Sequence, residues 1–486
     1  MRRTIILCNG KPAGTLESGK EFIFRYDKSW IDSGFALCPT MPLQGSSFPA
    51  ARLHGVFLDA TPDGWGRRVL QKAENYLAAQ ENRPAVLLQD LDCFERCDNF
   101  SRQGAIEVQK DIDAEIVPPG LEEALVSQVY YKIERIEQDE ETPEDVFQGL
   151  KRGISSGGAK PKFPMLVGGK LYMAKMRSRE DVVNVPAWEM VNFELAEHCG
   201  IATPEFHFHQ GIKTNLFIIR RFDRKDDSRI PYISVRTMLG VHENDHTASY
   251  GDIAEKCVDE DKKELFSRMA FNAAISNLDD HVRNHGFLLR EHGGTLEWRL
   301  SPVFDLESIS LPQEARFHSL ILGNNNTYPN RANILADHGR FGLSLKEAEE
   351  ILDSLVAEIH DHWRPLAEQY VSNEGEVQLM AGCYASPLLT KTVVAVAAQV
   401  GDKESPEALV QHVVRNGLDP RELEKAMPYV DADKLREELR SAADYPERWG
   451  VKQEEFEAWG KMHELGRKRE VPTPAGPRVE IVYDNF

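Results

Sequence analysis

The chain has 486 residues, long enough for two to four domains, and its 41% hydrophobic residues can fill substantial cores. Its formal net charge of −20 argues against broad, non-specific nucleic-acid binding by this chain alone, because neutralising phosphates requires a basic face. A local basic patch or a DNA-binding partner is compatible with this charge.

The cysteines and the apolar runs indicate the compartment. Around Cys93 and Cys97 no second CxxC or Cys/His pair completes a zinc site, so the seven scattered cysteines are interpreted as free thiols in a reducing compartment. The basic N-terminus has too short an apolar core for a signal peptide. No apolar run approaches the ~20 residues of a membrane span. We therefore expect a cytoplasmic protein.

Residues 1–107 are predicted to form an N-terminal subdomain rich in short strands. "TIILCNGKPAGTLE" (4–17) places a strand on each side of a Gly/Pro turn, and the aromatic-rich "EFIFRYDKSWI" (21–31) alternates in part between apolar and polar residues. Residues 108–149 are acidic and interrupted by proline. We expect a variable connection or an edge hairpin in this acidic connection.

The segment "DATPDGWGRR" (59–68) predicts a turn followed by a helix. Pro62 suits the first helical position, where its missing N–H costs nothing, and the helix is expected to reach about residue 80. Asp63 and Arg67 are interpreted as residues that hold this turn.

Residues 150–225 are first rich in glycine and then rich in predicted strands. "FPMLVGGKLYMAKM" (163–176) has two apolar runs around a Gly-Gly turn and predicts a hairpin. Residues 186–200 are apolar at helical spacing and end at a glycine. Two further strands are predicted within residues 206–224.

Residues 226–375 are predicted to be a mainly helical lobe, apart from "GFLLR" and "LEWRLSPVFDL". Residues 376–486 are predicted to be an additional helical region with a proline-rich tail. The order, strand-rich and then helix-rich, indicates an α+β fold with two lobes.

The polar stretch "SNLDDHVRNHGF" (276–287) carries the strongest chemical signal. Asp279 and Asn284 are five residues apart, which lets one loop present a base at one end and a metal ligand at the other. In phosphoryl transfer an aspartate accepts the proton of the attacking hydroxyl, and an asparagine five residues later can hold magnesium. This spacing alone is common by chance.

Asp305, in "WRLSPVFDLES" (298–308), strengthens the signal, because we expect it at the end of an apolar strand about 20 residues after Asn284. Between them lie two predicted strands around a Gly-Gly turn. A hairpin returns its far end to its start, so Asp305 is expected beside Asn284. Their oxygen atoms suit Mg²⁺, whose octahedron water and phosphates would complete.

The chain also contains candidates for a phosphate-binding loop, a phosphate lysine and an adenine contact, in an order that is compatible with a kinase. "ISSGGAKPKF" (154–163) can cradle phosphates with its backbone N–H groups. Lys175 is a candidate phosphate lysine with Glu189, at the start of the next helix, as its partner. Backbone groups around Arg220–Phe222 are placed to meet an adenine.

The polar stretch also has the residues of a metal site. His281 and His285 are four residues apart and, with "HENDH" (242–246), could form the zinc sites of a di-metal hydrolase, although no third motif fixes such a site. His281 is instead interpreted as a positioning residue that hydrogen-bonds within the loop. Asp280 is expected to cap or pair locally.

With these residues in hand, the chain resembles the HipA-like serine/threonine kinases, which are toxins of bacterial toxin–antitoxin pairs. The resemblance covers roughly residues 1–370 and depends on "GTLESGKEFIFRYDKSW", "TPDGWGR", "SSGGAKPK", "RRFDR", "DDHVRNHGF" and "LSPVFDL". It implies a bilobed fold distantly related to eukaryotic protein kinases.

The resemblance also implies site residues. Asp279 would be the catalytic base with His281 beside it, and Asn284 and Asp305 would hold Mg²⁺. The positions implied for ATP binding are Ser156, Gly157, Gly158, Ala159, Lys160, Lys162, Lys175, Arg220, Arg221 and Phe222.

In this family a serine that opens the glycine-rich loop can be autophosphorylated, which ejects the loop and stops ATP binding. Ser155 matches that position, with Ser156 adjacent. The family's targets are aminoacyl-tRNA synthetases, and the usual partner is a small DNA-binding antitoxin. A small-molecule kinase on a similar fold, and an inactive ATP-binding scaffold that binds an antitoxin, are the alternatives.

Overall fold

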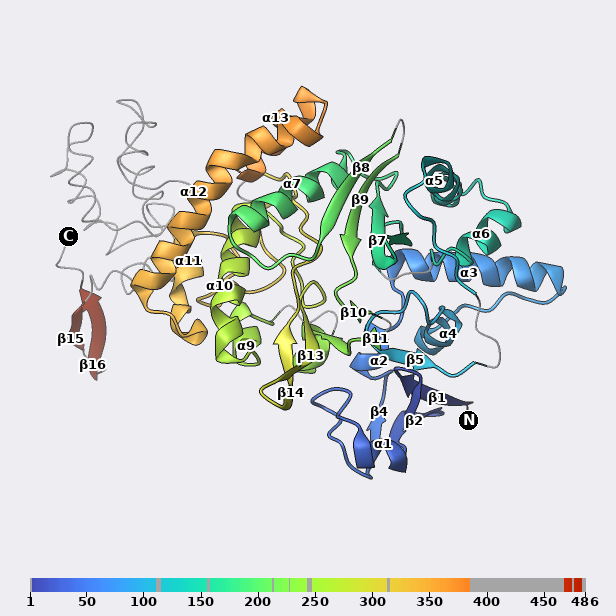
Figure 1. Ribbon diagram of the computed structural model, residues 1–486. Helices are drawn as coiled ribbons and strands as arrows, with labels where there is room; N and C mark the ends of the chain where they lie inside the picture. The colour runs from blue at the N-terminus through green and yellow to red at the C-terminus, as the bar shows by residue number, and fades with distance from the viewer. Residues whose placement is uncertain are drawn as a thin grey trace. The chain divides into compact units, whose positions relative to one another are not determined.

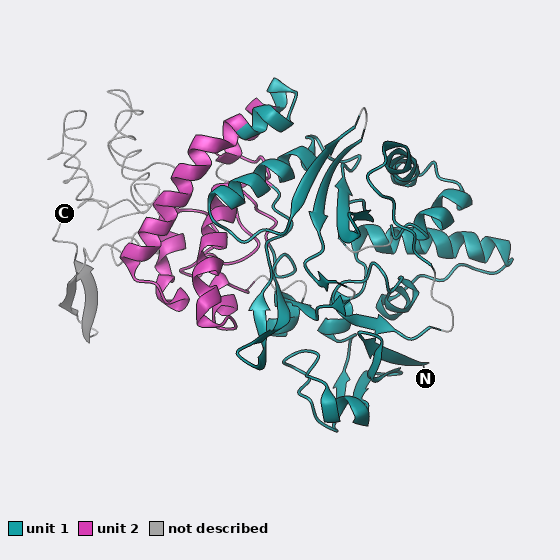
Figure 2. Cartoon of the chain, viewed as in Figure 1, with its two compact units in different colours: residues 1–245, 281–307, 366–376 teal, residues 246–280, 308–365, 377–486 magenta. Residues whose placement is uncertain are grey.

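The computed structural model describes residues 2–110, 115–154, 158–211, 214–226, 228–242, 247–312, 315–384, 467–473 and 476–482. The chain divides into two compact units (Figure 2). Unit 1 comprises residues 1–245, 281–307 and 366–376, and unit 2 comprises 246–280, 308–365 and 377–486. The division falls between Asp280 and His281, within the polar stretch of 276–287.

The N-terminal part of unit 1 is an antiparallel five-stranded sheet (Figure 1). In spatial order its strands are β4 (Ser47–Ala50), β3 (Phe22–Tyr26), β2 (Lys11–Ser18), β1 (Arg2–Cys8) and β5 (Ile106–Val108). Its helices are α1 (Lys28–Ser33), α2 (Gly55–Asp59), α3 (Gly64–Gln80) and α4 (Asp90–Arg96). The predicted hairpin of residues 4–17 is confirmed, with Asn9 and Gly10 both at positive φ in its turn.

Helix α3 ends near residue 80 as predicted but begins two residues after Pro62. The prediction that Pro62 is the first helical residue is therefore wrong. Asp63, the N-cap, is extended with φ of −118° and ψ of −175°, and Gly64 turns the chain with φ of +32°. These two residues redirect the backbone before the helix can start.

The acidic connection contains two helices, α5 (Glu123–Glu137) and α6 (Pro143–Leu150), rather than an edge hairpin. Val126, Val129, Ile133 and Ile136 are buried in one core cluster at helical spacing. Helix α6 begins with a capping box between Thr142 and Asp145. The charged residues between the apolar ones concealed this helical stripe.

The next sheet positions the candidate site. Its order is β6 (Lys162–Val167), β7 (Lys170–Met176), β9 (Asn215–Arg220) and β8 (Phe206–Gln210), all antiparallel. Helix α7 (Val185–His198) packs against it, with the Phe193 ring 4.8 Å from that of Phe217. The predicted hairpin around Gly168–Gly169, the helix and both strands are confirmed.

The remaining strands of unit 1 support the polar stretch. A small hairpin joins β10 (Arg224–Lys225) to β11 (Ser228–Arg229), and helix α8 (Val235–Leu239) follows β12. A three-stranded sheet has the order β12 (Tyr232–Ser234), β13 (Gly286–His292) and β14 (Thr295–Leu300). The predicted hairpin around the Gly-Gly turn is confirmed. The expectation of a strand that reaches Asp305 is wrong, because β14 ends at Leu300 and Asp305 has a φ of +62°, which no strand adopts.

Unit 2 is mainly helical in its described residues. Its helices are α9 (Tyr250–Ala254), α10 (Asp259–Ala274), α11 (Arg331–Ala336), the 3₁₀ helix η2 (His338–Phe341), α12 (Leu345–Tyr370) and α13 (Glu374–Tyr384); the last residues of α12 and the first of α13 belong to unit 1. The proline-rich tail lies within a hairpin of β15 (Arg467–Thr473) and β16 (Gly476–Val482). The helices predicted for 385–466 lie outside the described residues.

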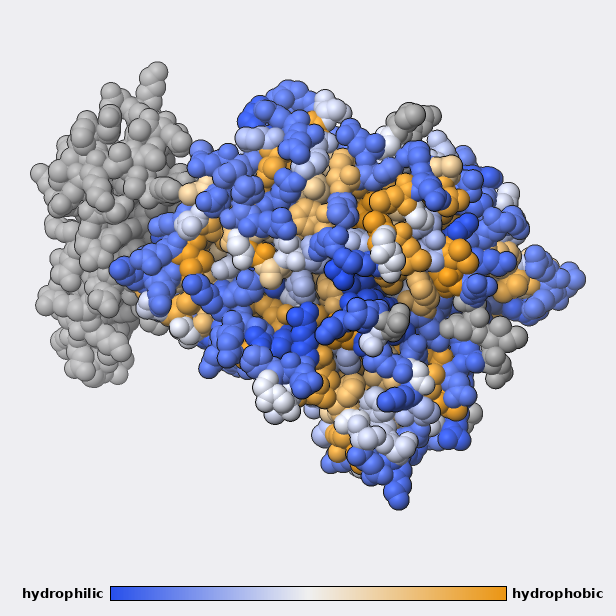
Figure 3. Space-filling view, viewed as in Figure 1, coloured by the Kyte–Doolittle hydropathy of each residue, from blue (hydrophilic) through white to orange (hydrophobic). Residues whose placement is uncertain are grey.

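The α+β fold class is confirmed by these sheets and helices. All seven cysteines lie in the described part of the chain, and none of them is joined in a disulfide there. Among the helices that the structure describes, none combines the length and apolar character needed to cross a membrane. On the face shown in Figure 3, hydrophobic residues lie in separate patches among hydrophilic ones.

Candidate active site

Lys175 is the centre of a three-residue ion-pair system in unit 1. Its Nζ lies 2.5 Å from Oε1 of Glu189, on α7, and 2.8 Å from Oδ1 of Asp305, which follows the β13–β14 hairpin. Lys175 and Asp305, 130 positions apart in the chain, are thus brought into one ion pair. The structure brings together the lysine and the glutamate that the sequence paired, and adds the aspartate.

The three groups perturb one another strongly. Burial raises the pKa of Glu189 from 4.5 to about 7, against the attraction of Lys175. Lys175 holds the pKa of Asp305 well below its usual range. Burial alone would lower the pKa of Lys175, but Asp305 and Glu189 outweigh burial and raise it. The lysine is therefore charged, and a carboxylate is kept ionised beside it.

Lys162 faces Lys175 across the β6–β7 pair, where the two residues are directly opposite each other. Burial and the neighbouring ammonium of Lys175 lower the pKa of Lys162. Two lysines placed together in a low-dielectric site repel each other, and an anion between them would relieve the repulsion. This pair therefore has the chemistry of a phosphate site.

The described part of the glycine-rich loop lies against Lys162. A Cβ added at Gly158 would lie 1.8 Å from Nζ of Lys162, and Gly158 has a φ of +109° that other residues rarely adopt. Ala159 follows it, and Lys160 pairs with Asp181 at 3.0 Å and with Glu307. Ser155, Ser156 and Gly157 lie outside the described residues.

Asp63 contacts both loops of the site, which the sequence analysis did not anticipate. Its Oδ1 accepts a hydrogen bond from the N–H of Gly158, and its Oδ2 lies 2.7 Å from Nη1 of Arg283. Sequence reasoning had assigned Asp63 to its own turn. Its partners are 95 and 220 residues away, so no local pattern indicates them.

The polar stretch of 276–287 is a series of turns between α10 and β13, not a helix. The proposal of zinc on one helical face of His281 and His285 therefore has no helix to rest on, and most of "HENDH" lies outside the described residues. Within unit 1, Asn284 N–H donates to the carbonyl of His281 at 2.8 Å. The Nδ1 atom of His281 is buried with no hydrogen-bond partner among the described residues.

Asp279 and Asp280 end the first segment of unit 2 and differ sharply in environment. Asp279 is exposed, whereas Asp280 is 1% exposed. Asp280 accepts hydrogen bonds from the Tyr250 hydroxyl and, at 2.9 Å, from Nδ2 of Asn272. Asp280 thus anchors the turn that presents Asp279, in agreement with the local role expected for it.

The segment of Arg220–Phe222 leaves β9, and its side chains are engaged elsewhere. Arg220 pairs with Glu205 at 3.3 Å, and Arg221 forms two hydrogen bonds, of 2.8 and 2.6 Å, to the carboxylate of Asp223. The Phe222 ring lies 5.6 Å from that of Phe304. The backbone N–H groups of Arg220 and Arg221 also donate within the protein, to the carbonyls of Glu205 and Leu171 at 2.8 and 2.9 Å. The adenine contact suggested by the sequence stays a prediction.

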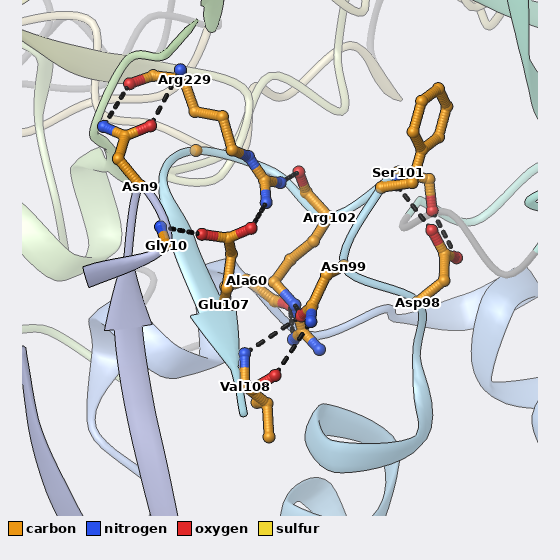
Figure 4. A network of polar contacts seen from close by, with 12 residues as sticks. Asn9, Gly10, Ala60, Asp98, Asn99, Ser101, Arg102, Glu107, Val108 and Arg229 are labelled. Carbon is orange, nitrogen blue, oxygen red and sulfur yellow. Dashed lines mark hydrogen bonds and ion pairs between the residues drawn. The ribbon is translucent and has the colours of Figure 1, made fainter. Parts of the chain in front are cut away.

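A polar network attaches the β10–β11 hairpin to the N-terminal subdomain (Figure 4). Nη2 of Arg229 donates to the carbonyl of Arg102 at 2.6 Å, and Nη1 lies 3.1 Å from Glu107. Asn9 donates to the carbonyl of Arg229 at 2.8 Å. Arg102, 3% exposed, donates in turn to the carbonyl of Ala60 at 2.8 Å. The N-terminal subdomain is thus tied to the hairpin that follows β9.

Comparisons with known proteins identify relatives of this architecture. Two family models match: the HipA N-terminal domain over residues 4–91 and the HipA-like C-terminal domain over residues 154–363. Among solved structures, the chain is similar to HipA of the Shewanella oneidensis MR-1 toxin–antitoxin system, solved with HipB and its operator DNA. The two are 18% identical, with a TM-score of 0.57, over 79% of this chain and 96% of that one. This likeness shows that the chain has the fold of HipA, in agreement with the predicted α+β fold class.

The chain is also similar to a second solved structure, the Helicobacter pylori proinflammatory kinase CtkA. The two are 15% identical, with a TM-score of 0.36, over 46% of this chain and 88% of that one. A search of curated proteins gives no match.

Proposed function

Because the chain belongs to the HipA-like family, we propose that it is an ATP-dependent protein serine/threonine kinase of HipA type. The observation that carries this proposal is the double ion pair of Lys175 with Glu189 and Asp305. In protein kinases, a lysine of the nucleotide-binding sheet paired with a helix glutamate, and a metal-binding aspartate, must both be in place. Here one lysine Nζ joins the two acidic groups.

The residues fit ATP and Mg²⁺ by the chemistry of their donors. Lys175 and Lys162 offer cations to the nucleotide phosphates, and the backbone N–H groups of the glycine-rich loop add neutral donors. Asp305 and Asn284 offer the oxygen ligands that Mg²⁺ prefers. When bound, Mg²⁺ neutralises charge that develops on the transferred phosphate.

Asp279 would take the proton of the substrate hydroxyl as that oxygen bonds to the γ-phosphorus and ADP leaves. Its exposure suits contact with a protein substrate. The anchoring of Asp280 by Tyr250 and Asn272 would limit the positions that Asp279 can take.

The family resemblance supports the finer parts of the proposal. We propose that a cytoplasmic protein, of the aminoacyl-tRNA synthetase class, is the substrate. Autophosphorylation of Ser155 would add about two negative charges where nucleotide phosphates bind and so weaken ATP binding. A small DNA-binding antitoxin is proposed as partner, because HipA of S. oneidensis was solved with HipB and its operator DNA and because the net charge of −20 is compatible with a DNA-binding partner.

The test is incubation of purified protein with Mg-ATP, followed by mapping of phosphorylated residues by mass spectrometry, with Asp279→Asn as control. Phosphate on Ser155 or Ser156 in the wild type alone would support both the kinase activity and the self-inactivation. ATP binding without any phosphate transfer would favour a small-molecule kinase or an inactive scaffold. Protein that is unphosphorylated at the loop and does not bind ATP would refute the proposal.

A further inference from the structure

We propose that Asp63 is a positioning residue through which the N-terminal subdomain holds two loops in place: the glycine-rich loop, through Gly158, and the polar stretch of 276–287, here called the catalytic loop, through Arg283. The inference rests on the proposed function and deepens it, because it gives a residue of the N-terminal subdomain (1–107) a role in positioning the proposed nucleotide site. A single carboxylate at the start of α3 contacts both loops.

The first contact is reciprocal and close. Gly158 N–H donates to Asp63, and Trp65 N–H donates to the carbonyl of Gly158 at 3.0 Å, so both polar groups of the Gly158 backbone are bound by one turn. A Cβ added at Gly64 would lie 2.7 Å from Cα of Ala159. Only glycine at position 64 allows the two backbones to approach so closely.

This contact bears directly on the phosphate lysines. The bound residue, Gly158, is the one that lies against Nζ of Lys162. Lys162 is in turn directly opposite Lys175 across the strand pair. Displacement of Gly158 from Asp63 would therefore change the backbone that covers the proposed phosphate site.

The second contact reaches the catalytic loop. Arg283 lies between Val282, whose carbonyl accepts from Arg236 N–H at 3.0 Å, and the proposed metal ligand Asn284. Its guanidinium is 2.7 Å from Asp63, whose side chain is 36% exposed. The loop is thus held by helix α8 through its backbone and by the N-terminal subdomain through one charge.

Two substitutions of Asp63 separate the two contacts. Asp63→Ala removes both, whereas Asp63→Asn keeps an oxygen for Gly158 N–H but loses the charge opposite Arg283. The control is Asp90→Asn, because Asp90 pairs with Arg67 at 2.7 Å in the same subdomain, and no ion pair or side-chain hydrogen bond joins it to the described residues of either loop.

We expect Asp63→Ala to raise KM for ATP and to lower kcat, each about tenfold, since about 1.4 kcal/mol from a lost charge-assisted hydrogen bond is a factor of ten. Asp63→Asn should lower kcat by about the same factor and leave KM within about twofold. Asp90→Asn should change neither by more than about twofold. Calorimetry of ATP binding should reproduce the KM pattern.

Hydrogen exchange without nucleotide tests the same inference independently of activity. Backbone amides of residues 158–163 should exchange faster in Asp63→Ala than in wild type or Asp90→Asn. Unchanged exchange there, together with wild-type ATP affinity in Asp63→Ala, would overturn the inference and leave the proposed function intact. A wild type that does not bind ATP would instead remove the proposed function, while faster exchange would still uphold the contact.

Discussion

Glu189→Gln is predicted to stabilise the protein and to lower its activity, with a gain in stability that depends on pH. Glu189 is 4% exposed, and burial raises the pKa of its carboxyl from 4.5 to about 7. A carboxyl whose pKa is raised on folding contributes stability below about pH 4.5, and this stability is lost as the pH rises through about 7. Glutamine has the shape of the protonated carboxyl and does not titrate.

The size of the effect follows from the two pKa values. A factor of ten in the acid constant is about 1.4 kcal/mol, so the wild type loses about 3 kcal/mol of unfolding free energy by pH 8 that the glutamine variant keeps. At pH 5.5 the difference shrinks to about 1 kcal/mol. Phosphoryl transfer should nevertheless fall at pH 8, because Lys175 loses one of the two carboxylates that hold it.

Urea denaturation at pH 5.5 and pH 8 measures both free energies, and the buried Trp188 beside Glu189 provides a fluorescence signal. Glu197→Gln, at an exposed position near the end of α7, is the matched control and should change neither stability nor activity. A Glu189→Gln variant less stable than wild type at pH 8 would show that the ion pair with Lys175 outweighs burial, and the reasoning would be wrong.

Three further substitutions test other parts of the site. Lys175→Met leaves two carboxylates without their shared cation and should lower the unfolding free energy by about 3–5 kcal/mol in urea and abolish ATP binding in calorimetry. Tyr250→Phe removes a donor from buried Asp280 and should cost about 1–3 kcal/mol; a change below about 0.5 kcal/mol would contradict this role. Gly158→Ala should weaken ATP binding at least about tenfold, because alanine rarely adopts the φ of +109° at this position and its methyl would displace Nζ of Lys162; unchanged affinity would refute it.

The sequence was informative wherever the signal was local. The hairpins at Gly168–Gly169 and Gly293–Gly294 were predictable because all four glycines supply the positive φ that their turns require. The spacing of Asp279 and Asn284 is likewise a local signal, because both residues lie in the one segment of 276–287. Residues close together in the chain were sufficient to predict these elements.

Long-range contacts and backbone strain were not predictable in the same way. Asp63 was assigned to its own turn because its two partners are contributed by distant loops. The strand expected to reach Asp305 stops at Leu300, shortly before Pro302, which has no N–H to donate to a ladder. Asp305 itself has a φ of +62°, outside the range of strands. In α5 the charged positions concealed an apolar stripe that became recognisable only against its core.

The charges around Lys175 explain why Asp305, rather than Glu189, is suited to be the metal ligand. One ammonium cannot neutralise two carboxylates in a low-dielectric site, so one of the two is driven toward its protonated form. The buried Glu189 is that group, whereas the Asp305 side chain is 45% exposed and Lys175 keeps its pKa low. Asp305 therefore stays ionised with part of its carboxylate open to a cation.

The backbone of Asp305 supports the same assignment. A left-handed conformation at a residue other than glycine costs on the order of 1–3 kcal/mol and persists only where the surroundings fix it. Here the ion pair with Lys175 at 2.8 Å is such a constraint. One lysine thus fixes the direction of the proposed metal ligand and keeps it charged, and the buried glutamate on α7 holds that lysine in place.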